Sequence, residues 1–130
     1  AECKRYDKVL EQLRQDIQVL GIGSNGHIAF NEPGTPFDCT THIVDLTEST
    51  IKDNSRLFKS IDEVPRQAFT MGPKNIMNAK KILILATGKN KAKAVYGLVK
   101  GEVTTEVPAS ILQKHEDCIL VCDKEAASLL

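Results

Sequence analysis

Residues 17–34 read IQVLGIGSNGHIAFNEPG, a short apolar run followed by a glycine-rich segment. The run at residues 17–20 predicts a strand that ends at Gly21, and the glycines and prolines that follow predict an irregular chain as far as Thr41. Open α/β sheets place their active sites beyond the carboxyl ends of such strands. We therefore expect the polar residues of this segment to form the functional site.

Two later apolar runs, residues 81–87 and 118–122, also predict buried strands, and residues 43–46 predict a shorter one. Helices are expected at residues 6–13, 47–58 (with Thr47 as N-cap), 88–100 and 108–114, and at segments that begin near Val64, Gly72 and Lys124. Buried strands that alternate with helices predict a parallel sheet covered on both faces. The fold class is therefore α/β, and we expect residues 1–130 to be part of a larger unit.

The composition excludes several classes of partner. Lys plus Arg and Asp plus Glu are equal at 17 each, so no net charge attracts nucleic acid or an anionic membrane. No apolar run approaches the roughly 18 residues of a membrane-spanning helix, and no signal-type apolar stretch follows the N-terminus. We expect a cytoplasmic protein with a small-molecule ligand and with no nucleic-acid or membrane partner, whereas a monomer and a homo-oligomer both stay open.

The four cysteines are expected to be free thiols, because no secretory signal accompanies them. His115, Cys118 and Cys122 suggest a zinc site, but residues 118–122 have the pattern of a buried strand. Four residues of strand separate the two sulfurs by about 13 Å. One zinc ion, with ligands at about 2.3 Å, cannot bind both, so we expect no metal.

The spacing of Gly21, Gly23 and Gly26 matches the G-x-G-x-x-G pattern of dinucleotide-binding loops, and Asp45 lies where a ribose-binding acid is expected. Such a loop must open a helix whose N-terminus holds the pyrophosphate. The sequence PGTP at residues 33–36 leaves no room for that helix, so this interpretation fails. A tight turn with no further role explains the glycines, but it does not explain the polar side chains beside them.

Three of those polar side chains suit proton transfer. His27 is the side chain that best exchanges protons near neutral pH. Glu32 can orient an imidazole and stabilise its charged form, and Asn25 can add a hydrogen bond through its amide. The segment therefore predicts a general acid/base unit.

The segment LGIGSNGHIAFNEPG at residues 20–34 is similar to the signature of the glucosamine-6-phosphate deaminases, and the similarity continues through THIVDLT (41–47), NSRLF (54–58), TMG (70–72) and VCD (121–123). The related 6-phosphogluconolactonases share a Gly-His loop but lack the FNEP continuation. The resemblance implies a doubly wound, Rossmann-like parallel-sheet domain with three layers, of which residues 1–130 form the C-terminal half. It also implies conversion of glucosamine 6-phosphate and water to fructose 6-phosphate and ammonia, without a cofactor.

The resemblance implies roles for five residues. His27 would open the sugar ring, and Glu32 and Asn25 would hold its imidazole. Many members of the family have Asp at the position of Asn25, and the neutral amide makes charge stabilisation depend more on Glu32. Arg56 and Lys91 would bind the phosphate, the first through a bidentate fork and the second as a point charge.

This chain departs from the family pattern in two ways. The Asp that moves the proton between C2 and C1 belongs to the N-terminal half, so no residue here is assigned that role. Regulated members carry two basic residues where this chain has His42 and Val44, so their effector site is not expected. The alternative function is the sugar-phosphate-binding effector domain of a transcription regulator, although such a domain needs no proton shuttle of the kind that His27 and Glu32 form.

Overall fold

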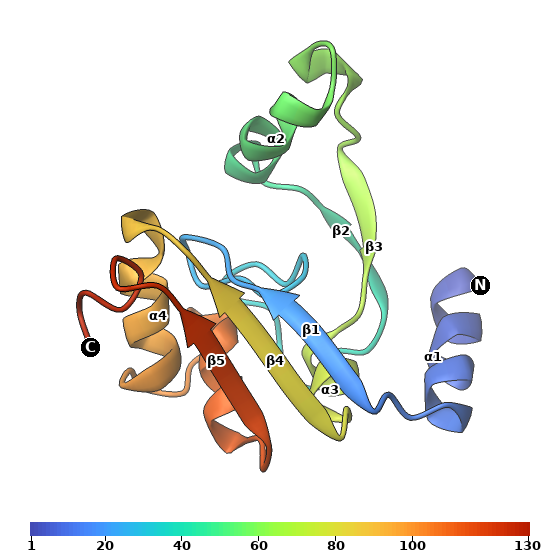
Figure 1. Ribbon diagram of the computed structural model, residues 1–130. Coiled ribbons are helices and arrows are strands. Elements are labelled where there is room, and N and C mark those ends of the chain that lie inside the picture. The colour runs from blue at the N-terminus through green and yellow to red at the C-terminus, as the bar shows by residue number, and fades with distance from the viewer.

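The structure, a computed structural model, describes residues 1–130 and is built around a three-stranded parallel sheet (Figure 1). The strands are β1 (Ile17–Gly21), β4 (Lys81–Ala86) and β5 (Cys118–Cys122), in the order β1-β4-β5. The three apolar runs therefore form the predicted strands. Because the strands are parallel, the loops that follow β1 and β4 lie at the same edge of the sheet.

One face of the sheet packs against helices. The side chains of Leu20, Ile82 and Ile84 on this face are buried, and they meet Val95 and Leu112 in a single apolar cluster. The covering elements are α3 (Pro73–Met77), α4 (Ala92–Val99) and the 3-10 helix Pro108–Lys114. Figure 1 shows α4 behind the sheet.

The opposite face of the sheet is uncovered. Val19, Leu85 and Val121 point to this face and are 56%, 45% and 53% exposed. The sequence predicts cover on both faces, but residues 1–130 supply it on one face only. We call the uncovered side, with Ile17, Val19, Leu85, Ile119 and Val121, the bare sheet face.

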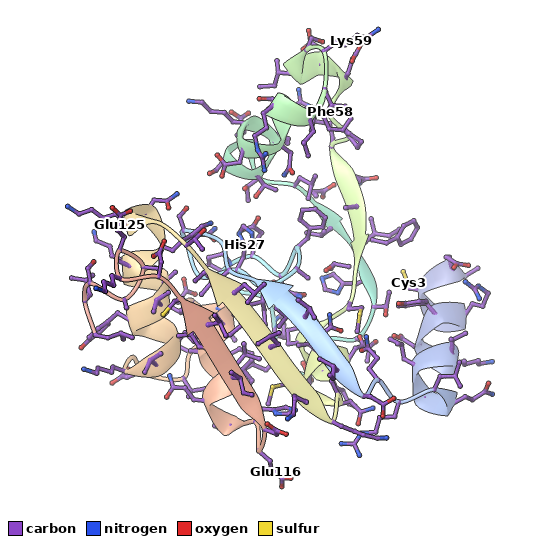
Figure 2. The ribbon with its side chains drawn as sticks, viewed as in Figure 1. Cys3, His27, Phe58, Lys59, Glu116 and Glu125 are labelled. Carbon is purple, nitrogen blue, oxygen red and sulfur yellow. The ribbon has the colours of Figure 1, made fainter.

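A separate antiparallel hairpin stands away from the sheet (Figure 1). Its strands are β2 (His42–Asp45) and β3 (Gln67–Thr70), and α2 (Glu48–Asn54) lies between them. Thr47 caps α2 as predicted, by accepting a hydrogen bond from the backbone N–H of Thr50. The helix continues as a 3-10 turn at Ser55–Leu57, and a separate 3-10 turn follows at Ile61–Glu63 after an extended stretch. Phe58 and Lys59 lie at the tip of the hairpin (Figure 2).

Two predicted helices do not form. No helix begins at Val64, which is extended (φ −71°, ψ 124°) and leads through Pro65 into β3. A proline forces the residue before it out of the helical region, and its own φ also suits an extended chain. From Lys124 onward the chain forms turns rather than a helix, because the N–H groups of Ser128 and Leu130 bond to carbonyl oxygens three residues earlier instead of four.

The N-terminal helix α1 (Glu2–Gln12) forms as predicted and is held to the rest of the chain through Asp7. One carboxylate oxygen of Asp7 accepts hydrogen bonds from the Thr41 backbone N–H at 3.0 Å and from Asn75 Nδ2 at 3.1 Å. Partial burial raises the pKa of Asp7, but the hydrogen bonds from Thr41, Thr40 and Asn75 outweigh that effect. They hold the pKa of Asp7 below 3.8, the ordinary value for an aspartate. None of the helices combines the length and the apolar character needed to cross a membrane.

Candidate active site

The glycine-rich loop after β1 folds into a tight turn that presents His27. Gly26 has φ +86°, and its N–H donates to the carbonyl oxygen of Gly23 at 2.9 Å. Gly23 is required for a different reason: a Cβ there would lie 2.3 Å from the imidazole Nδ1 of His27. The glycines therefore let the backbone approach the ring closely, and Figure 2 shows His27 beyond the carboxyl ends of the strands.

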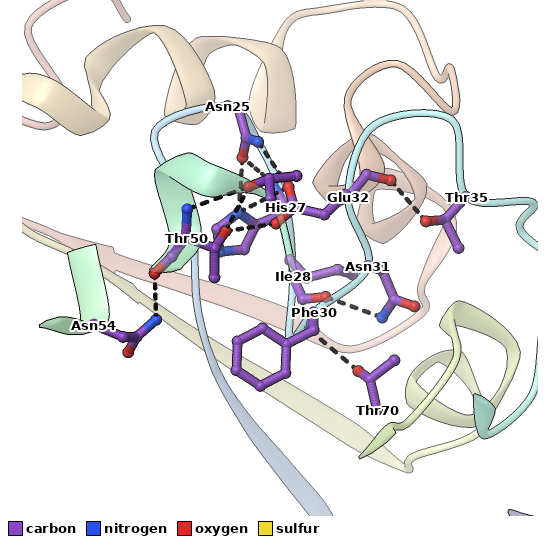
Figure 3. Close-up of polar contacts among 11 residues, drawn as sticks. Asn25, His27, Ile28, Phe30, Asn31, Glu32, Thr35, Thr50, Asn54 and Thr70 are labelled. Carbon is purple, nitrogen blue, oxygen red and sulfur yellow. Dashed lines mark hydrogen bonds and ion pairs between the residues drawn. The ribbon is translucent and has the colours of Figure 1, made fainter. Parts of the chain in front are cut away.

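Asn25, His27 and Glu32 form one hydrogen-bonded cluster (Figure 3). Asn25 Oδ1 lies 2.8 Å from His27 Nδ1, and Asn25 Nδ2 donates to Glu32 Oε2 at 2.8 Å. His27 Nδ1 is also 3.5 Å from Glu32 Oε2. Loop geometry thus brings together the three residues that the sequence predicts as an acid/base unit.

The hydrogen bonds of Asn25 determine which nitrogen of His27 carries the proton. The backbone N–H of His27 donates to Asn25 Oδ1 at 3.2 Å, and the carboxylate of Glu32 can only accept, so the amide orientation is fixed. With an oxygen facing it, His27 Nδ1 must carry a proton. The neutral imidazole therefore has its lone pair on Nε2, where it can act as a base.

Glu32 is 9% exposed and accepts a second hydrogen bond at its other oxygen. Thr50 Oγ, on α2, donates to Glu32 Oε1 at 2.7 Å (Figure 3). The buried carboxylate is therefore hydrogen-bonded at both oxygens, as a buried charge requires. No local sequence pattern marks Thr50, which lies 18 residues from Glu32 and meets it only through the fold.

A second turn, Ile28 to Asn31, positions the rest of the loop. Ala29 has φ +50° and is the one non-glycine residue with a positive φ, a conformation that costs about 1–2 kcal/mol. Asn31 holds the turn by donating from Nδ2 to the carbonyl oxygens of Ile28 at 3.0 Å and Met71 at 2.8 Å. The N–H of Phe30 donates to Thr70 Oγ at 3.1 Å. Strain at Ala29 is thus balanced by hydrogen bonds on either side.

An open cavity of about 580 Å³ lies beside this cluster. His27 lines it from the loop after β1, Arg56 from the 3-10 turn after α2, and Lys91 from the 3-10 helix Lys89–Lys91 after β4. The two cations that the sequence predicts as phosphate ligands therefore share one cavity with the imidazole. Its other lining residues are Gly21, Ile22, Gly23, Ala29, Phe30, Thr50, Asp53, Asn54 and Asn90.

The turn that carries Lys91 is tied to the end of β5. Asp123 Oδ2 accepts from the Gly88 N–H at 2.9 Å, and Asp123 Oδ1 accepts from the Ala126 N–H at 2.8 Å. The backbone hydrogen bonds from Ala126 and Gly88 hold the pKa of Asp123 below 3.8. Gly88 itself has φ +89°, a conformation that favours glycine.

The four cysteines are free, and burial raises the pKa of the Cys118 thiol. Thiolates and carboxylates are common metal ligands. The acid/base unit and the two cations contain no thiolate, and their one carboxylate belongs to Glu32. Both oxygens of Glu32 are occupied by hydrogen bonds from Asn25 and Thr50. The arrangement therefore suits proton transfer and anion binding rather than metal coordination.

The chain matches the family model described as glucosamine-6-phosphate isomerases/6-phosphogluconolactonase over residues 1–121. It is 62% identical over all 130 residues to a glucosamine-6-phosphate deaminase of Lactobacillus delbrueckii subsp. bulgaricus, covering 56% of that protein. It is 57% identical to the deaminase of Streptococcus sanguinis, covering 55% of it. The chain therefore spans about half the length of the curated relatives that it matches.

Solved structures agree with this match. A monomeric glucosamine-6-phosphate deaminase superposes with a TM-score of 0.95 at 51% identity, over 99% of this chain and 54% of that one. A 6-phosphogluconolactonase from Trypanosoma brucei superposes with a TM-score of 0.74 at 24% identity, over 98% of this chain and 52% of that one. The second similarity shows a shared fold.

Proposed function

The chain belongs to the glucosamine-6-phosphate isomerase/6-phosphogluconolactonase family, and from that membership we propose that the enzyme built on it is a glucosamine-6-phosphate deaminase. The reaction converts glucosamine 6-phosphate and water to fructose 6-phosphate and ammonia. The observation that carries the proposal is the cavity in which the His27 imidazole faces the same space as Arg56 and Lys91. An acid/base group and two cations in one cavity suit a sugar phosphate.

His27 opens the sugar ring in this proposal. Its Nε2 takes the proton of the anomeric hydroxyl and returns a proton to the ring oxygen, which yields the open-chain aldehyde. Hydrogen bonding of Nδ1 to Asn25 leaves Nε2 available for both steps. When the His27 imidazole is protonated on both nitrogens, Glu32 Oε2, which lies 3.5 Å from Nδ1, stabilises its positive charge.

Arg56 and Lys91 bind the phosphate. Arg56 offers a planar fork to two phosphate oxygens, and Lys91 adds a compact charge. They approach from different elements, so the phosphate fixes the sugar relative to both the hairpin and the sheet. This anchoring holds the anomeric centre near His27, which is the usual contribution of a non-reacting group to catalysis.

The comparisons favour the deaminase reaction over lactone hydrolysis. Identity is 57–62% to the curated deaminases above, against 24% to the lactonase structure. The loop also carries Phe30, Asn31, Glu32 and Pro33 in the order of the deaminase signature. Nothing in the fold, the site or the comparisons favours the effector domain of a regulator.

Ammonia release by the full-length enzyme that contains this chain tests the proposal. Glucosamine 6-phosphate is expected to give ammonia and fructose 6-phosphate in equal amounts, and 6-phosphogluconolactone is expected to be hydrolysed no faster than in buffer. An enzyme that hydrolyses the lactone and releases no ammonia would show that the other branch of the family is the correct one.

A further inference from the structure

The hairpin meets the acid/base cluster at a single polar contact. We call residues 46–66, which include α2 and the turn with Arg56, the arm segment. The hydrogen bond from Thr50 Oγ to Glu32 Oε1 is the only hydrogen bond that joins the arm segment to the rest of the chain. Figure 1 shows α2 standing apart from the sheet, which agrees with so sparse a connection.

This contact is shielded from water. Thr50 is 5% exposed, and its neighbour Ile51 is 3% exposed. Thr47 Oγ donates to Thr50 Oγ at 3.0 Å, which leaves the Thr50 hydroxyl hydrogen directed at Glu32. A hydrogen bond from a buried hydroxyl to a buried carboxylate is strong and directional, so it can fix the orientation of the Glu32 side chain.

The contact also completes a chain of hydrogen bonds that runs from α2 to His27. Thr50 bonds to one oxygen of Glu32, the other oxygen bonds to Asn25, and Asn25 bonds to Nδ1 of His27. Within α2, Asn54 Nδ2 donates to the carbonyl oxygen of Thr50 at 2.8 Å, and Asn54 lies two residues before Arg56 in the sequence. Arg56 and His27 line the same cavity.

We propose that Thr50 is a positioning residue that links phosphate binding at Arg56 to the orientation of Glu32 and, through Asn25, to His27. The inference rests on the proposed function, in which Arg56 binds the phosphate of the substrate. A phosphate held by both Arg56 and Lys91 fixes the arm segment against the sheet. The Thr50 hydroxyl then stays on Glu32, and the imidazole is held in the orientation that ring opening requires.

Kinetics of the full-length enzyme test the effect on catalysis. Thr50→Val keeps the shape of the side chain and removes the hydroxyl, and it is expected to lower kcat for glucosamine 6-phosphate about tenfold. Thr50→Ser keeps the hydroxyl and is expected to stay within about threefold of wild type. Thr50→Ala serves in place of Thr50→Val if the valine variant does not fold, as judged by thermal unfolding.

A double-mutant cycle with Arg56→Ala separates this role from a merely structural one. In the Arg56→Ala background the phosphate no longer fixes the arm segment, so Thr50→Val is expected to cost less than about threefold in kcat. A merely structural defect would lower kcat by the same factor in the wild-type and Arg56→Ala backgrounds. Equal factors, or no loss of kcat in either background, would overturn the proposal.

Hydrogen exchange with inorganic phosphate gives a readout that does not need turnover. In wild type and Thr50→Ser, phosphate is expected to slow exchange both in residues 48–54 and in the loop residues 25–32. In Thr50→Val it is expected to slow exchange in residues 48–54 only. Loop protection that is unchanged by Thr50→Val would refute the link, even if the enzyme proves to act on another sugar phosphate.

Discussion

The amide of Asn25 donates from Nδ2 to Oε2 of Glu32 at 2.8 Å. This bond makes Asn25 a neutral bridge between a carboxylate and the imidazole of His27. An Asp at this position would bring two carboxylates within hydrogen-bond distance, which disfavours ionisation of one of them. With Asn25, the cluster has one negative charge, on Glu32, to pair with a protonated His27.

Replacement of His27 by glutamine is expected to lower kcat by about 10²-fold or more, because an amide cannot exchange protons as an imidazole does. KM for glucosamine 6-phosphate should change little, because the phosphate ligands remain. Steady-state kinetics of the full-length enzyme measure both constants. His42→Gln, which lies on β2 outside the cavity, is the matched control. A kcat for His27→Gln within about threefold of wild type would remove His27 from the mechanism.

Arg56→Ala and Lys91→Ala are expected to raise KM for glucosamine 6-phosphate by at least about tenfold each, because each loses a charged contact with the phosphate. Any turnover of unphosphorylated glucosamine should be nearly unaffected. Lys89→Ala is the control, since Lys89 shares the 3-10 helix with Lys91 but does not line the cavity. Equal losses for both substrates would mean that these side chains do not contact the phosphate.

The carboxylate of Asp123 is expected to stabilise the fold only when it is ionised. Its pKa in the folded chain is lowered below 3.8 by hydrogen bonds from Ala126 and Gly88. The stabilisation is therefore complete above the unfolded pKa and is lost as pH falls through the folded value. The difference in Tm between wild type and Asp123→Asn should be largest above about pH 5 and should shrink below about pH 3.

Thermal unfolding at several pH values measures that difference, with Asp62→Asn as the control because Asp62 is exposed on the hairpin. NMR titration of the Asp123 carboxyl gives the folded pKa directly. A midpoint at or above 3.8 would show that the two backbone hydrogen bonds do not favour the ionised form.

Residues 1–130 produced alone are expected to be catalytically silent and to self-associate or bind a hydrophobic dye. The bare sheet face exposes apolar side chains on all three parallel strands, at about 25 cal/mol for each Å² left in water. Leu85→Lys, at the centre of this face, should reduce dye binding, whereas Ile61→Lys on the hairpin should not. A monomer with a sharp unfolding transition, no dye binding and measurable ammonia release would contradict this expectation.

Local sequence predicts the parallel strands because each is a short and mainly apolar run, as in residues 82–86. It fails at β3, because the sequence QAFT at residues 67–70 is neither a continuous apolar run nor an alternation of polar and apolar residues. Only pairing with β2, which lies more than twenty residues earlier, makes this segment a strand. The helix expected at Val64 was wrong for the same reason: a proline suits both structures, and tertiary pairing decides between them.

The site divides in a similar way. Asn25, His27 and Glu32 lie within eight residues, so one loop can bring them together and the sequence points to all three. Arg56 and Lys91 were identified through resemblance to a family, because isolated basic residues have no local pattern. Thr50 and Asp123 were missed, since a threonine at a helix start and an aspartate after a strand look like ordinary capping residues.

The contact between Gly23 and His27 has a consequence for entropy. The ring lies against bare backbone where even a methyl group would clash, and Asn25 bonds to its Nδ1. The imidazole therefore has little rotational freedom before any ligand arrives. The imidazole loses its conformational entropy when the chain folds, so substrate binding does not have to offset that loss. More of the binding free energy therefore remains for positioning the reacting sugar.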